Sequence, residues 1–173
     1  MWYVIQVMSG HEPSTIRKIE HRADPKTYSR VFNLKRMQRR KRNGEWTDEV
    51  EILFPGYVFV DTKTPREFCA ELTKVAALTK FLVSGEGSDR RFIPISEDEM
   101  TLINALVGGE GDVMKVSEGV IEGGEVVITS GPLLGQEALV KKIDRHKRLA
   151  WLEADMFGRR LTFKVGLEIV RKS

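Results

Sequence analysis

The chain has 173 residues, 31% of them charged and 41% hydrophobic, which is enough for one ordinary domain or two small ones that fold without disulfide or metal support. A single cysteine excludes an intramolecular disulfide, the Cys and His residues lack zinc-site spacing, and no apolar run approaches the roughly 20 residues of a membrane span. We therefore expect a soluble cytoplasmic protein.

Positive charge is concentrated in one segment. The chain has 28 Lys and Arg against 25 Asp and Glu, but six of the eight residues in Lys35–Arg42 are cationic, and without them 22 bases face 25 acids. Strand-like patterns at 31–37 and 49–60 flank this run, which ends at Asn43-Gly44, the strongest short hairpin signal. The basic run is therefore predicted to lie on a hairpin arm.

The remaining patterns of the first 106 residues mix strand and helix. Residues 2–7 are rich in residues that favour β-strands. Turn residues and then apolar residues at helical spacing follow them, which predicts a strand, a turn and a helix. Helical spacing also appears at 65–78, and a capping box at 96–99 predicts a third helix. Strands followed by helices on one antiparallel sheet indicate an α+β domain over 1–106.

The second part of the chain has a different pattern. Residues 107–118 contain three glycines and show neither the helical nor the strand spacing of apolar residues, so they are predicted to be a linker. From 119 to 173, short alternating strands are separated by turn residues every eight to twelve positions, which predicts a small all-β barrel.

No residue pattern points to catalysis. His11, His21 and His146 lie in separate segments, and the chain has no Gly-x-Ser-x-Gly, phosphate-binding lysine loop or His-Glu-x-x-His motif. Cys69 lies in a predicted helix, where a small apolar packing role explains it. We expect no enzyme, no metal and no cofactor.

Two basic clusters are candidates for contact with nucleic acid, because cations neutralise phosphates without reading base sequence. The alternatives are an edge strand protected from aggregation by its charges and an ordinary exposed turn of the barrel. The candidates are Lys35, Arg36, Arg39, Arg40, Lys41 and Arg42 in the arm and Lys141, Lys142, Arg145, Lys147 and Arg148 in the barrel.

Six aromatic residues come from strands predicted to share one sheet: Trp2, Tyr3, Phe54, Tyr57, Phe59 and Phe81. Strand side chains alternate between faces, so some of them point away from the core. If Tyr3, Phe54 and Tyr57 face outward together, they form an apolar patch of the kind that marks a site for a protein partner.

Six motifs occur in order along the chain. They are 2–7 (WYVIQV) with 9–12 (SGHE), 53–60 (LFPGYVFV), 93–96 (IPIS), 126–128 (VVI) with 130–135 (SGPLLG), 142–144 (KID) and 156–159 (MFGR). In this order they resemble the NusG family of transcription elongation factors, with an amino-terminal NGN domain and an SH3-like KOW barrel.

The resemblance implies a bacterial, monomeric factor that lays an aromatic and apolar depression against the clamp helices of the largest RNA polymerase subunit. Preferential binding to the closed, elongating clamp would shift the polymerase toward elongation. The residues that the motifs carry over to this role are Tyr3, Ile5, Leu53, Phe54 and Tyr57.

Two departures from the general family pattern are informative. Ala138 occupies a position where general members have Gly, as it does in specialised paralogs such as RfaH. Residues 160–164 (RLTFK) replace the usual Thr-Pro-Val-Glu, which argues against the family's barrel contacts with Rho and a small-subunit ribosomal protein.

With the basic arm, these departures favour a specialised, operon-targeted antiterminator, of the LoaP or RfaH type, that binds nascent RNA such as a hairpin. The alternatives are a general NusG-type elongation and termination factor and, from another class, a ribosome-associated KOW protein that binds RNA.

Overall fold

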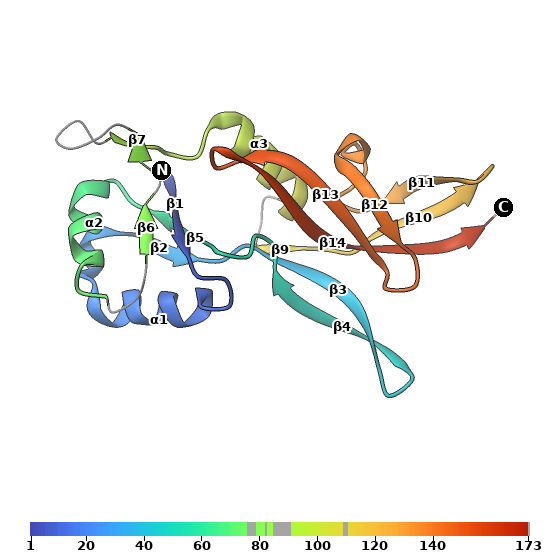
Figure 1. Cartoon of the computed structure of the whole chain (residues 1–173), viewed down its shortest axis with the longest axis horizontal. Helices are drawn as coiled ribbons and strands as arrows, with labels where there is room; N and C mark the ends of the chain where they lie inside the picture. The colour runs from blue at the N-terminus through green and yellow to red at the C-terminus, as the bar shows by residue number, and fades with distance from the viewer. Residues whose placement is uncertain (76–78, 82, 85–90, 109–110, 173) are drawn as a thin grey trace. The chain divides into compact units, whose positions relative to one another are not determined.

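The computed structural model describes residues 1–75, 79–81, 83–84, 91–108 and 111–172. The chain forms two compact units (Figure 1). The first consists of Met1–Asn33 and Phe54–Glu97, and the second of Leu34–Leu53 and Asp98–Ser173. Among the described residues, no helix is both long and apolar enough to span a membrane.

The first unit is built on an antiparallel sheet with the strand order β2-β5-β1-β6. These strands are β1 (Trp2–Val7), β2 (Arg30–Phe32), β5 (Tyr57–Asp61) and β6 (Thr79–Phe81). The other elements are α1 (Glu12–Arg22), η1 (Pro25–Thr27), α2 (Pro65–Leu72) and the strand pair β7 (Val83–Ser84) and β8 (Arg91–Phe92). The helix predicted over 65–78 ends at Leu72, with Thr73 as its C-cap, so the prediction is wrong for residues 73–75. Residues 76–78 lie outside the described residues.

Helices α1 and α2 pack against one face of this sheet, and the alternation of β1 explains which side chains they cover. Tyr3 is opposite Val60 and Ile5 is opposite Val58 in the β1–β5 register. These four side chains form one buried cluster with α1 and α2 residues, including Ile19 and Phe68. Trp2 and Val4 therefore point to the opposite face.

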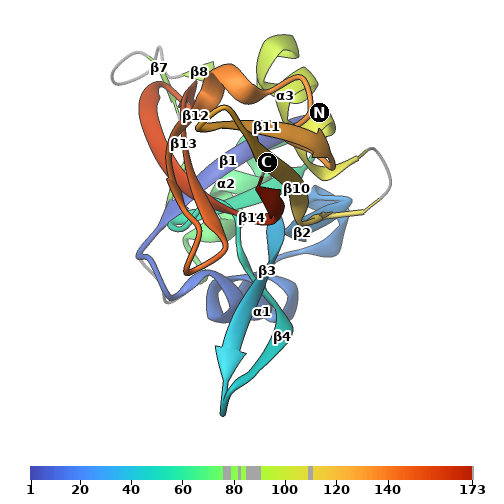
Figure 2. The same cartoon turned by 90° about the vertical axis from the view of Figure 1, so that its right-hand side faces the viewer.

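The second unit begins with the predicted hairpin, made of β3 (Lys35–Arg42) and β4 (Glu45–Ile52). Asn43 and Gly44 form its two-residue turn with φ values of 50° and 82°, as a type I′ turn requires. The Asn-Gly prediction is confirmed, and the whole basic run lies on β3. The hairpin tip extends away from the remaining strands of this unit (Figure 2).

The largest part of the second unit is a five-stranded sheet with the order β11-β10-β14-β13-β12, which we call the barrel. Its strands are β10 (Ser117–Glu122), β11 (Glu125–Ser130), β12 (Val140–Asp144), β13 (Leu149–Met156) and β14 (Arg159–Lys172). The unit also contains η3 (Glu137–Leu139), and α3 (Glu97–Val107) lies in it from Asp98 onward. The predicted fold class, α+β followed by an all-β KOW barrel, is confirmed.

The structure bears on two expectations about the second half of the chain, the linker and Ala138. Residues 107–118, expected to be a linker, contain β9 (Val113–Met114), which pairs with β3, and the start of β10; residues 109–110 lie outside the described residues. The domain boundaries at 106 and 119 stay predictions. Ala138 is exposed within η3 and has no positive φ, so its Cβ is accommodated there.

Candidate functional site

An aromatic cluster lies on the face of the first unit's sheet opposite α1 and α2. The ring centroids of Trp2 and Phe32 are 4.7 Å apart, those of Phe32 and Phe59 are 5.7 Å apart, and those of Phe54 and Phe59 are 6.3 Å apart. The Arg30 guanidinium lies 3.9 Å from the Phe32 centroid. Only Trp2, which is half-buried, and the exposed Arg30 reach the surface of this cluster.

The five residues predicted to contact the polymerase, Tyr3, Ile5, Leu53, Phe54 and Tyr57, are all at most 7% exposed. Tyr3 and Ile5 lie under the helices, whereas Tyr57 is opposite Gln6 and so lies on the aromatic face. Tyr3 and Tyr57 thus occupy opposite faces, and the outward patch considered for them does not form. Their role toward the polymerase stays a prediction.

Sequence reasoning placed Trp2 in the aromatic set but did not select it, and it missed Phe32 and Arg30. The alternation of side chains along β1 could have pointed to Trp2. Trp2 lies on the same face of the strand as Gln6, and Gln6 is paired with Tyr57 across the sheet. Tyr3 instead lines a cleft of about 400 Å³ at the start of α2, together with Lys63, Thr64, Pro65, Arg66 and Glu67.

Glu12, the first residue of α1, holds the turn that carries Phe54 and Tyr57. Its carboxylate is 1% exposed and accepts hydrogen bonds from the backbone N–H groups of Gly10, at 2.9 Å, and Gly56, at 2.6 Å. The Val7 N–H donates to the Gly56 carbonyl at 2.9 Å. Glu12 therefore ties the end of β1 to the turn at Gly56.

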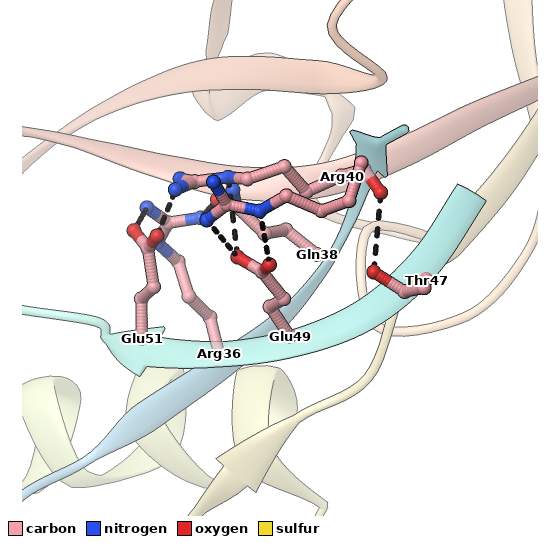
Figure 3. A network of polar contacts seen from close by, with 7 residues as sticks. Arg36, Gln38, Arg40, Thr47, Glu49 and Glu51 are labelled. Atoms are coloured by element: carbon pink, nitrogen blue, oxygen red, sulfur yellow. Dashed lines mark hydrogen bonds and ion pairs between the residues drawn. The ribbon is translucent and has the colours of Figure 1, made fainter. Parts of the chain in front are cut away.

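The basic arm is largely neutralised by its partner strand (Figure 3). Arg36, which is 5% exposed, pairs with Glu51 at 2.9 Å, and Arg42 pairs with Glu49 at 2.9 Å. Arg40 pairs with both of these carboxylates. Opposite charges on paired strands stabilise a hairpin. Arg36 and Arg40 are therefore already engaged by acids that sequence reasoning did not weigh.

The structure brings the two predicted basic clusters together at one carboxylate. Glu168 on β14 pairs with Arg39 of the arm and with Arg148 of the β12–β13 turn, at 2.8 Å each. The Arg148 guanidinium also lies 3.8 Å from the centroid of the Trp46 ring on β4. Arg39 and Arg148 thus fasten the hairpin to the barrel.

The other predicted cations remain available to a ligand. They are exposed and, within the described ranges, make no ion pair: Lys35 and Lys41 in the arm and Lys141, Lys142, Arg145 and Lys147 in the barrel. No group of three His, Cys, Asp or Glu residues in the described part of the chain is arranged to hold a metal ion.

The Arg42–Glu49 pair gives a pH prediction. The hydrogen bond from Arg42 holds the pKa of Glu49 below its ordinary value, so the stabilisation from this pair is present above the unfolded pKa of about 4.3 and is lost as pH falls through the folded pKa. Arg42→Gln should raise the Glu49 pKa toward that value, as measured by NMR titration of its carboxyl carbon. Arg17→Gln on α1 is the control, and an unchanged Glu49 pKa in Arg42→Gln would contradict the pairing.

Comparisons with known proteins agree with this architecture. Residues 1–104 match the family model described as transcription termination factor nusG, and residues 122–153 match the KOW motif. The chain is 29% identical over 172 residues to the transcription termination/antitermination protein NusG of Streptococcus pyogenes, covering 96% of this chain and 92% of the relative. It is 30% identical to the protein of the same name from Lactococcus lactis, covering 91% and 85%.

A solved structure described as showing domain interaction in Thermotoga maritima NusG aligns with 97% of this chain and 93% of its own, with a TM-score of 0.56 and 26% identity. The motif order, the α+β unit with its aromatic face and the barrel thus coincide with one family over both halves. The chain belongs to the NusG family of transcription termination and antitermination factors.

Proposed function

We propose that this protein binds the clamp helices of RNA polymerase through the aromatic face of its first unit and promotes processive elongation or antitermination. The observation that carries the proposal is the position of Trp2. The half-buried Trp2 packs edge-on against the buried Phe32, and a rigid aromatic ring backed by packed neighbours is the usual anchor of a protein interface.

The other residues of the face have supporting roles in this proposal. Arg30, stacked on Phe32, supplies a cation beside the Trp2 ring, and Glu12 holds the Gly56 turn in place. Phe54 and Tyr57 are both buried, so in this proposal they support the accessible residues and do not contact the polymerase themselves. Preferential binding to the closed clamp would then shift the polymerase toward its elongating state without any catalysis by this chain.

The exposed cations support a second part of the proposal, contact with nascent RNA that targets the factor to particular operons. A general NusG-type factor remains the alternative, since family membership does not separate the two roles. The ribosome-associated alternative predicts co-sedimentation with ribosomal subunits, whereas this proposal predicts co-sedimentation with polymerase.

Trp2→Ala should weaken binding of purified RNA polymerase at least about 30-fold, because truncation of an anchor typically costs about 2 kcal/mol or more. The measurement is polymerase binding by biolayer interferometry, after circular dichroism has established that the variant folds. Trp46→Ala, which removes a ring from the hairpin, is the matched control. Wild-type affinity in folded Trp2→Ala would exclude the aromatic face as the docking site. Phe54→Ala is a poorer test because it removes a buried ring.

A further inference from the structure

A tryptophan flanked by two lysines lies across three neighbouring strands of the barrel. Trp151 on β13 is opposite Lys142 on β12 and Lys164 on β14, so the three residues form one row across the sheet (strands labelled in Figure 1). The Lys142 ammonium lies 5.1 Å from the centre of the Trp151 ring, and the Lys164 ammonium lies 5.8 Å from it.

This row is on the outer face of the barrel. Along β13, the residues on either side of Trp151, Ala150 and Leu152, are fully buried, whereas Trp151 is half-buried and Asp155, four positions on, is exposed. Strand alternation therefore places Trp151 among the outward residues, where the core does not need an aromatic ring. Its size must be explained by something other than core packing.

The two lysines differ from the arginines of the hairpin arm in being available. Both side chains are exposed, and among the residues that the structure describes neither makes an ion pair. Arg36, Arg40 and Arg42, by contrast, are held by carboxylates on β4. Lys141, Arg145 and Lys147, on β12 and in the turn after it, are also exposed.

We propose that this row, Lys142, Trp151 and Lys164, binds single-stranded RNA: an unpaired base stacks on Trp151, and the phosphates on either side of it contact the two lysines. An aromatic ring on an open sheet face, bordered by cations, is the arrangement by which proteins bind unpaired nucleotides. The proposal deepens the proposed function and rests on it only for the choice of RNA as the ligand.

Mutual stabilisation of a tryptophan and two lysine stems is the simpler explanation of the contacts. Among the described residues, however, neither ammonium group has an ion-pair partner, and a cation–π contact at an exposed site is weaker than the stacking of a base. A nucleotide can therefore replace a lysine over the ring while the released ammonium moves to a phosphate. The charge of the row and its surroundings complements a polyanion.

The test is fluorescence titration of the full chain with an unstructured 12-nucleotide uridine RNA, alongside a blunt RNA duplex. Trp2→Phe and Trp46→Phe leave Trp151 as the single tryptophan of the chain. We expect the uridine RNA to quench Trp151 and the duplex to bind more weakly without quenching. Trp151→Leu should weaken binding of the single strand about 5- to 150-fold, the range that corresponds to the loss of one stacked base.

A second variant keeps the Trp151 ring in place and changes only the two lysines. Lys142→Gln with Lys164→Gln should lower the slope of log affinity against log salt by about 1.4, since each phosphate contact to a single strand contributes about 0.7. Lys26→Gln, an exposed lysine in η1, is the control for a general change in charge. An unquenched Trp151, or equal quenching and affinity with the duplex, would overturn the proposal.

Polymerase retention is measured on the wild-type chain, because the fluorescence samples carry Trp2→Phe at the proposed docking anchor. It separates this inference from the proposed function. Retention of polymerase without quenching by the uridine RNA overturns the RNA site and leaves the proposed function in place. Quenching without retention overturns the polymerase docking proposal and leaves the RNA site supported.

Discussion

Glu12→Ala is expected to lower the free energy of unfolding by about 2–6 kcal/mol, because it leaves two N–H donors without their acceptor and each such loss costs about 1–3 kcal/mol. Glu12 is 1% exposed, and its carboxylate accepts hydrogen bonds from the N–H groups of both Gly10 and Gly56. The measurement is urea unfolding followed by circular dichroism.

Two variants make the Glu12 test specific. Glu12→Gln keeps one good acceptor and should lose less stability than Glu12→Ala, whereas Glu20→Ala, at an exposed position of the same helix, should change stability by less than about 0.5 kcal/mol. The Gly56 amide resonance should shift in Glu12→Ala because its hydrogen bond is lost. A variant as stable as the wild type would show that Glu12 does not hold this turn.

Gly166→Val is expected to cost about 1–3 kcal/mol and to loosen the hairpin from the barrel, because the added side chain has no space. A Cβ at this position would lie 2.6 Å from the Met37 carbonyl oxygen and 3.0 Å from the Val116 side chain. Met37 contributes a backbone atom of β3, which cannot rotate away as a side chain could. The strand must shift, and the Arg39–Glu168 pair must lengthen with it.

Hydrogen exchange of the β3 and β4 amides measures this effect. We expect faster exchange in Gly166→Val with little change in the amides of β10 and β11. Thr162→Val is the matched control, since Thr162 is exposed on the same strand and an even number of residues away, and so on the same face. Equal protection of the hairpin in Gly166→Val and the wild type would contradict a close approach of β3 at this glycine.

The hairpin illustrates what local sequence predicts well. Asn43-Gly44 specifies a turn with two positive φ values, and the alternation of its flanking strands specifies the pairing, so the arm could be located from a few adjacent residues. The charge state of the arm could not be inferred from the Lys35–Arg42 run alone. Glu49 and Glu51 neutralise it from the paired strand, and their effect depends on the register of the two strands.

The candidate sites likewise divide into features that local sequence predicts and features that depend on the tertiary structure. The motifs of the chain identify its family, but they do not show that the helices cover Tyr3 and Ile5 while Trp2 lies on the opposite face. The row of Lys142, Trp151 and Lys164 joins three residues spread over 23 positions of sequence, and no local pattern connects them.

By itself, the sequence determined the order of domains, the hairpin turn, the barrel pattern and the family, because each depends on short-range backbone preferences or on motifs. Only the tertiary structure decided which aromatic residues are accessible, which cations are already paired, and that Gly166 must lack a side chain. Those properties depend on strand register and on the approach of segments far apart in the chain. In this protein, Glu168 is the clearest case: its carboxylate holds Arg39, 129 positions away, and Arg148, 20 positions away.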